Sequence, residues 1–195
     1  TPTFSVNSAT ICSGNSTALT ASGATSYSWN TGATTSSISV SPTSATNYTV
    51  VGTTNGCTNS QVTNVNVNTN PTIAVNSATI CFGNSAALTA SGASSYSWNS
   101  GANTPSISVS PTLTTNYTVT GTAANGCTNT NVASVNVNTL PNVTVSSATI
   151  CSGSTGTLSA SGANTYTWNT GATGSNLSVN PTINTTYTVT GTSAT

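Results

Sequence analysis

The sequence predicts an all-β protein made of tandem β-sandwiches of about 70 residues each, with no helix. Three observations give this fold class. One segment recurs three times almost residue for residue, apolar and polar residues alternate over short runs, and turn residues separate those runs. Alternation with a period of two, rich in Val, Ile, Thr, Tyr and Trp, is typical of half-buried antiparallel strands. Many short strands of this kind in a small unit indicate a sandwich.

The repeat defines the domain organisation. Its tryptophans recur at intervals of 69 and 70 residues, at Trp29, Trp98 and Trp168. We therefore predict repeat 1 at residues 1–69, repeat 2 at 70–139 and repeat 3 at 140–195. Repeat 3 lacks the last strand, which the other repeats carry at residues 64–68 and 134–138. Pro71 and Pro141 favour extended linkers, so adjacent units are expected to form a semi-rigid rod.

The alternating pairs of repeat 1 give its strands in chain order. They are Leu19/Ala21, Tyr27/Trp29, Ile38/Val40, Tyr48/Val50 and Val65/Val67. The turns between them are Ser22-Gly23, Asn30-Thr31-Gly32, Ser41-Pro42 and Asn55-Gly56. Asn-Gly between two alternating runs is a strong hairpin signal, because both residues tolerate positive φ. About seven strands per repeat are expected.

The aromatic residues are expected to be structural. Trp29 shares a strand face with Tyr27, and the alternatives are a sugar-stacking platform or a core position between two sheets. The core position is favoured, because sandwiches commonly bury one such tryptophan. Tyr48 is a candidate tyrosine corner whose hydroxyl bonds to nearby backbone. The same core assignments apply to the equivalent residues Trp98, Trp168, Tyr117 and Tyr187.

Composition excludes several classes of function. The chain contains no Lys, Arg, Asp, Glu or His. General acid–base catalysis, activated nucleophiles, metal coordination and phosphate binding all depend on those side chains. An enzyme, a metal or cofactor site and a nucleic-acid partner are therefore not expected. Insertion into a membrane is not expected either, because no apolar run approaches the roughly 20 residues of a membrane span.

The cysteines predict disulfides. Cys12 and Cys57 fall in repeat 1, and Cys81 and Cys127 occupy matching places in repeat 2. We predict the bridges Cys12–Cys57 and Cys81–Cys127, each closing a loop that contributes about 4 kcal/mol. Disulfides indicate an oxidising, extracytoplasmic compartment. Cys151 has no partner. Either the chain continues beyond Thr195, which is favoured, or a neighbouring subunit completes repeat 3; a free reactive thiol is the third and weakest explanation, because the chain has no base or cation to activate it.

These residues together resemble a known family. The run Cys-x-Gly-x-x-x-x-Leu-Thr-Ala-Ser-Gly is followed by Tyr-Ser-Trp-Asn-Thr-Gly-Ala-Thr, Ile-Ser-Val-x-Pro-Thr, Asn-Tyr-Thr-Val and Asn-Gly-Cys. It is similar to the immunoglobulin-like (PKD-like) tandem repeats of large secreted Bacteroidota cell-surface adhesin and stalk proteins. The resemblance implies Ig-like sandwiches that act as spacers or adhesive modules, often exported by the type IX secretion system. The chain departs from that pattern in carrying no charge.

The leading functional hypothesis is a non-catalytic extracellular structural protein at the cell surface. Its tandem repeats would self-associate into a filament, stalk or surface fibre, or belong to a longer array, with sugars on exposed Ser and Thr as candidate partners. The alternative is an adhesin module that binds glycans or another surface. Ice binding by Thr-rich faces is a remote third hypothesis, since Thr on outward strand positions is equally explained by its β-propensity.

Overall fold

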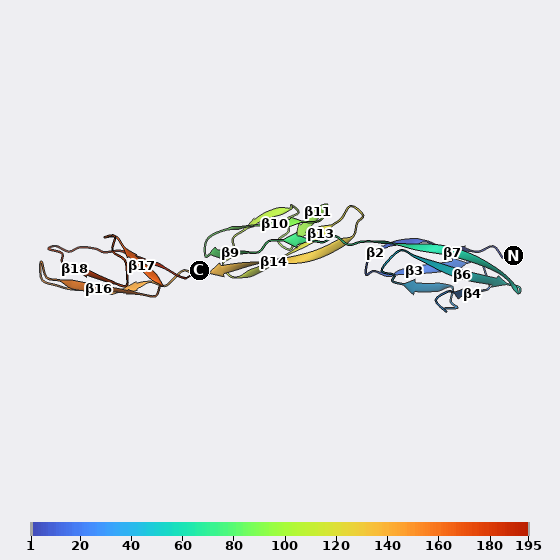
Figure 1. The fold of residues 1–195 in the computed structure, drawn as a ribbon, viewed down its shortest axis with the longest axis horizontal. Helices are drawn as coiled ribbons and strands as arrows, with labels where there is room; N and C mark the ends of the chain where they lie inside the picture. Colours follow the sequence, from blue (N-terminus) through green and yellow to red (C-terminus); the bar gives the residue numbers. More distant parts are fainter. Residues whose placement is uncertain (1, 195) are drawn as a thin grey trace. The chain divides into compact units, whose positions relative to one another are not determined.

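The computed structural model describes residues 2–194, and within that span the chain is all-β with no helix. Nineteen strands form six sheets within the described residues. The ribbon in Figure 1 accordingly shows strands and loops without a helix. The chain divides into two compact units. The first holds residues up to Asn76 with Thr89–Ile107 and Tyr117–Ala133, and the second holds Ser77–Leu88, Ser108–Asn116 and the segment from Ser134 onward.

Repeat 1 contains seven strands in two sheets. They are β1 (Ser5–Val6), β2 (Ala9–Cys12), β3 (Thr17–Ser22), β4 (Ser26–Trp29), β5 (Ser37–Val40), β6 (Thr46–Thr54) and β7 (Cys57–Asn68). One sheet has the order β1-β3-β5 and the other β2-β7-β6-β4. Their pairings are antiparallel except that β2 runs parallel to β7. That parallel pair places the C-terminal ends of β2 and β7, Cys12 and Asn68, side by side.

Repeat 2 has the same strand order. Its strands are β8 (Ala74–Val75), β9 (Ala78–Cys81), β10 (Ala86–Ser91), β11 (Ser95–Trp98), β12 (Ser106–Val109), β13 (Thr115–Thr122) and β14 (Thr128–Asn138). The sheets run β8-β10-β12 and β9-β14-β13-β11. The β9–β14 pair is again parallel.

Repeat 3 contains five strands within the described residues. They are β15 (Thr144–Val145), β16 (Gly156–Ser161), β17 (Thr165–Trp168), β18 (Asn176–Val179) and β19 (Val189–Thr192). One sheet has the order β15-β16-β18, and β17 pairs with β19 in the other. Residues 148–151, which match β2 and β9 in sequence, form no strand.

The core of repeat 1 joins its two sheets. Leu19 comes from one sheet, Val50 and Val65 come from the other, and all three are 0% exposed. Trp29 belongs to the same cluster, and its indole Nε1 donates a hydrogen bond to the carbonyl of Thr35 at 2.9 Å. Burying an aliphatic side chain of this size contributes about 1.5–3 kcal/mol, so the inward positions of the alternating pattern hold the layers together.

Asparagine amides tie the strands to the loops. The backbone N–H of Thr20 donates to Asn7 Oδ1 at 2.6 Å, and that of Thr49 donates to Asn30 Oδ1 at 3.3 Å. Asn59 Nδ2 donates to the carbonyl of Pro2 at 3.0 Å. An amide both donates and accepts, so it can satisfy backbone groups that ionic side chains serve elsewhere. In the described part of the chain, no buried side-chain nitrogen or oxygen lacks a hydrogen-bond partner.

Candidate functional site

The cysteines lie at the ends of the strands, and their positions correct the predicted pairing. Cys12 ends β2 and pairs in register with Asn68, the last residue of β7. Cys57 is the first residue of β7. Eleven residues of strand at about 3.3 Å each separate the two ends of β7 by roughly 36 Å, far beyond disulfide reach. The predicted Cys12–Cys57 bridge is therefore wrong.

The structure joins Cys12 to Cys127 instead. Their Cα atoms are 5.6 Å apart and the two residues are separated by 115 positions in sequence. The bridge links predicted repeat 1 to predicted repeat 2, and both residues belong to the first compact unit. It also overturns the predicted Cys81–Cys127 bridge, which fails for the same reason. Cys81 pairs in register with Asn138, at the far end of β14 from Cys127.

The linker between the bridged repeats is fixed by amides close to the disulfide. Asn70 Nδ2 donates to the carbonyl of Ser13 at 3.1 Å, and Asn125 Nδ2 donates to the carbonyl of Thr69 at 3.3 Å. The backbone N–H of Cys127 donates to Asn125 Oδ1 at 3.0 Å. The side chain of Cys127 is fully buried. The disulfide is thus part of an ordered junction.

The hairpin loop before Cys127 is one residue longer than the loop before its counterpart Cys57, and this changes the position of the cysteine. In repeat 1, Asn55 (φ 52°) and Gly56 (φ 75°) form a two-residue turn, and Cys57 pairs in the ladder with Thr54. Repeat 2 has one more residue in the loop, and the N–H of Ala123 donates to the carbonyl of Cys127 at 2.8 Å. Because β14 begins only at Thr128, Cys127 lies outside the ladder and its side chain is free to cross to Cys12.

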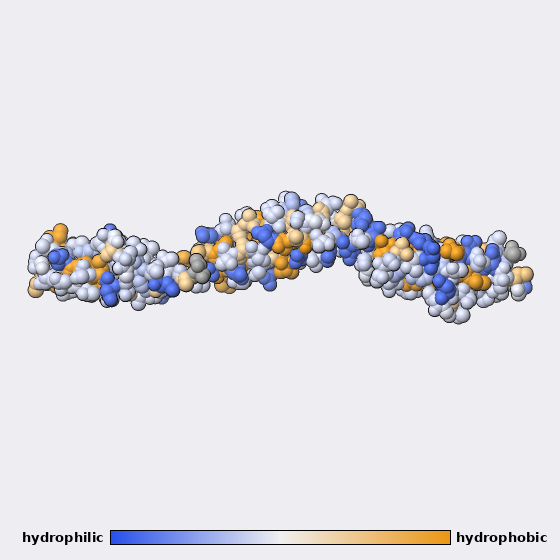
Figure 2. Space-filling model, in the orientation of Figure 1, coloured by the Kyte–Doolittle hydropathy of each residue, from blue (hydrophilic) through white to orange (hydrophobic). Residues whose placement is uncertain are grey.

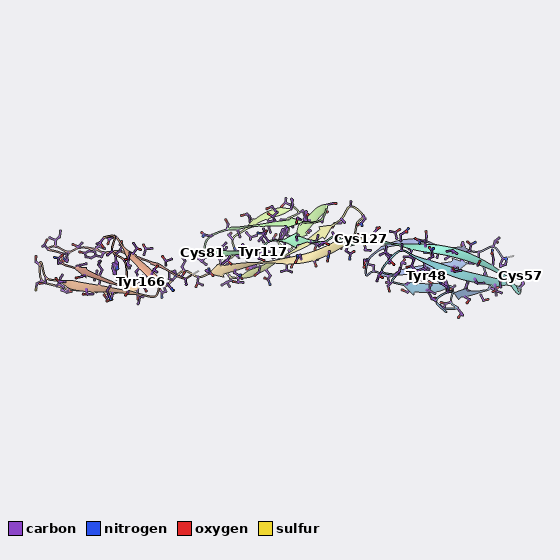
Figure 3. All side chains as sticks on the ribbon, in the orientation of Figure 1. Tyr48, Cys57, Cys81, Tyr117, Cys127 and Tyr166 are labelled. Carbon is purple, nitrogen blue, oxygen red and sulfur yellow. A yellow bond between two sulfur atoms is a disulfide. The ribbon has the colours of Figure 1, made fainter. Side chains whose placement is uncertain are left out.

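Three cysteines carry free, exposed thiols: Cys57, Cys81 and Cys151. Cys57 lies at the tip of the β6–β7 hairpin (Figure 3). Residues 2–194 contain no group of three or more potential metal-ligating side chains. Disulfide formation and exchange are open to these thiols, and each occupies a position equivalent to one partner of the Cys12–Cys127 bridge.

The tryptophans are buried. Trp29 and Trp98 are each 3% exposed and Trp168 is 2% exposed. Each indole Nε1 donates to a backbone carbonyl six residues on, at 2.9–3.0 Å. Their ring faces are therefore closed to a sugar, and the glycan-adhesin hypothesis loses the residues on which it relied.

The tyrosines correct a second expectation. Tyr48, Tyr117 and Tyr187 are half-buried. The hydroxyls that bond to nearby backbone belong instead to Tyr27, Tyr96 and Tyr166. Tyr96, for example, accepts from the N–H of Ala93 at 3.0 Å and donates to its carbonyl at 3.1 Å. No such bond is found for Tyr48 in the described residues.

Repeat 3 carries a groove of about 640 Å³. It is lined by residues 145–150 and Ser152 on one segment, by residues 181–187 on another, and by Leu158 and Val179. The rest of the visible surface shows apolar residues in small separate patches among polar ones (Figure 2). No helix among the described residues is long and apolar enough to span a membrane.

Comparison with known proteins gives distant structural likenesses. No protein-family model and no curated protein matches the sequence. A Ca²⁺-stabilised ice-binding adhesin of an Antarctic bacterium is 17% identical, with 92% of this chain and 63% of that chain covered at a TM-score of 0.38. The eight N-terminal Ig domains of Down syndrome cell adhesion molecule are 16% identical, covering 86% and 34%, also at 0.38. Titin domains I67–I69 are 11% identical, covering 86% and 78%, at 0.36. Likenesses this distant do not assign the chain to a family.

Proposed function

We propose that this chain is a non-catalytic structural protein of an extracellular filament or stalk, built from tandem Ig-like sandwiches whose junctions are cross-linked by disulfides. The observation that carries the proposal is the Cys12–Cys127 bridge, which joins one repeat to the next. A disulfide within a single sandwich stabilises that sandwich alone. One that crosses a junction restricts the motion of neighbouring repeats, as a protein that carries tension or acts as a spacer requires.

Three further features support this function. Repeats 1 and 2 share their strand order, so one structural unit is used again along the chain. A chain without acidic, basic or imidazole side chains offers none of the usual catalytic groups. The disulfide favours an oxidising location such as the cell exterior.

Disulfide mapping of native material tests the junction. Trypsin has no cleavage site in a chain without Lys and Arg, so the digest must use chymotrypsin, which cuts after the aromatic residues. A peptide containing Cys12 linked to one containing Cys127 is expected. Recovery of Cys12 linked to Cys57 would remove the basis of the proposal.

Negative-stain imaging before and after reduction tests the function itself. Straight fibres or rods are expected under oxidising conditions, with greater curvature and shorter end-to-end distances after reduction. Cys12→Ser should reproduce the reduced appearance, and Cys57→Ser, which removes a free thiol in repeat 1, serves as the matched control. Compact, unextended particles under oxidising conditions would contradict a filament or stalk.

A further inference from the structure

Two Asn-Gly pairs lie in hairpin turns, and the same residues follow both of them. Asn55-Gly56 and Asn125-Gly126 are each followed by Cys-Thr-Asn, and the chain has no third Asn-Gly pair. A difference in reactivity between the two asparagines of the folded chain therefore comes from their surroundings rather than from the residues that follow them.

An asparagine that precedes a glycine is open to a reaction that needs no enzyme and no cofactor. The backbone nitrogen of the glycine attacks Cγ of the asparagine, the Cγ–Nδ2 bond breaks, and ammonia leaves with the amide proton. Water then opens the five-membered imide to give aspartate or isoaspartate. Glycine favours the first step because it has no Cβ to obstruct the approach of its nitrogen. The reaction requires that the backbone nitrogen and the side-chain amide be free to approach each other.

Three hydrogen bonds hold Asn125 and the nitrogen that would attack it. Asn125 Nδ2 donates to the carbonyl of Thr69 at 3.3 Å, and its Oδ1 accepts from the N–H of Cys127 at 3.0 Å. The N–H of Gly126 donates to the carbonyl of Ala123 at 2.9 Å. Cys127 itself is fully buried and disulfide-bonded. The reaction at Asn125 therefore has to break these hydrogen bonds first.

Asn55 lacks these restraints. Asn55, Gly56 and Cys57 are all exposed at the tip of the β6–β7 hairpin, and the thiol of Cys57 is free. Within residues 2–194, no hydrogen bond holds the side chain of Asn55 or the N–H of Gly56. The side-chain amide and the glycine nitrogen are therefore free to approach each other in contact with water.

We propose that Asn55 is a modification site, at which the folded chain loses ammonia and gains a carboxylate, and that the junction around Cys127 protects Asn125 from the same change. A hydrogen bond of ordinary net strength slows a reaction that must break it by a factor of about five. The three hydrogen bonds at Asn125 together should make Asn55 react at least about 10-fold faster in the folded chain.

The change has different consequences at the two positions. The formal net charge of the chain is 0, because it has no Lys, Arg, His, Asp or Glu, so an aspartate at position 55 supplies its first ionic side chain. At position 125, a carboxylate has no hydrogen to donate to the carbonyl of Thr69, and two oxygens would face each other at the junction. Protection of Asn125 therefore preserves the contacts that fix the linker.

Incubation of the intact, oxidised chain in water enriched in heavy oxygen tests the proposal. Opening of the imide adds one solvent oxygen, which marks only the residues that react during the incubation. Chymotrypsin separates the two sites, because it cuts after Tyr117 and other aromatic residues between them, and fragmentation of the peptides locates the label. Label should appear at Asn55 at least about 10-fold faster than at Asn125. In the reduced, urea-unfolded chain the two rates should become equal.

Matched variants supply the controls. Asn55→Gln should remove the acidic product, because glutamine closes a six-membered ring far more slowly, and Asn55→Asp marks where a chain with one added carboxylate elutes from an anion exchanger. Cys12→Ser, which opens the junction bridge, should speed the reaction at Asn125. Cys57→Ser, which removes a free thiol instead, should leave the rate at Asn125 unchanged.

Several outcomes would overturn the proposal. Absence of label at Asn55, equal labelling of Asn55 and Asn125 in the folded chain, or faster labelling of Asn125 would remove the assignment of the site. Unequal rates in the unfolded chain would remove the structural explanation, and an unchanged rate at Asn125 in Cys12→Ser would remove protection by the junction. None of these results bears on the filament, because the reaction at Asn55 takes place within a single chain and requires no assembly.

Discussion

Reduction of the Cys12–Cys127 bridge should lower the thermal stability of repeats 1 and 2 by an amount that the loop length sets. The bridge spans 115 residues. On the chain-entropy model, closing a loop of that size stabilises the folded state by about 4.8 kcal/mol at 25 °C. The unfolding entropy of roughly 140 residues is about 0.29 kcal/mol per K. The ratio gives a decrease in Tm of about 17 °C.

Calorimetry of the intact chain with and without a strong thiol reductant measures this shift. The structure holds no other disulfide in residues 2–194, so reduction acts on one bond there. Cys12→Ser should reproduce the effect under oxidising conditions, and Cys57→Ser should leave Tm within about 2 °C, as expected for an exposed surface substitution. A reduced protein that melts within about 3 °C of the oxidised one, or a Cys57→Ser variant that melts about 17 °C lower, would refute the reasoning.

Three further predictions concern packing, charge and proteolysis. Gly52→Ala should lower the free energy of unfolding of repeat 1 by about 1–3 kcal/mol in urea, because the added Cβ would lie 2.9 Å from Phe4 Cδ1 and 3.0 Å from Ala24 Cβ. The control Ala18→Ser, at an exposed position, should have little effect. Tm should change by less than about 2 °C between 10 mM and 1 M NaCl, and between about pH 5 and pH 7, because no ionic side chain is present to be screened or to titrate there; a shift of about 10 °C would contradict this. Trypsin should leave the mass of the chain unchanged even after unfolding in urea, because the chain has no Lys or Arg, whereas chymotrypsin should cut the unfolded chain. Tryptic fragments would contradict this prediction.

Local pattern was enough to predict the strands but not their partners. Alternation at Leu19/Ala21 and Tyr27/Trp29 placed segments in β3 and β4, and Asn55-Gly56 placed the β6–β7 turn, because side-chain alternation and turn chemistry act over a few residues. The parallel pairing of β2 with β7 has no comparable local signal. It joins residues more than fifty positions apart, and it decides which end of the sandwich Cys12 occupies.

The tyrosines show the same limit at smaller scale. The sequence assigned a backbone-bonded hydroxyl to Tyr48 from its place before a late strand. The structure gives that role to Tyr27, whose hydroxyl accepts from the N–H of Ala24 only three residues away. Both residues lie in alternating runs, so the pattern alone could not distinguish a hydroxyl that folds back onto its own turn from one that does not.

The position of the cysteines changes what the disulfides contribute. With one cysteine at each end of β7, a bridge inside repeat 1 is geometrically excluded. The sandwich must therefore fold on its own core, through residues such as Leu19, Trp29 and Val50, and on the amide hydrogen bonds that replace ionic contacts. The bridge then acts on the junction, where it adds a covalent link to the amide hydrogen bonds that hold the linker. Under the proposed function, a further bridge of the same kind needs a thiol at each end of a repeat, and repeat 1 carries Cys12 and Cys57 at opposite ends of β7.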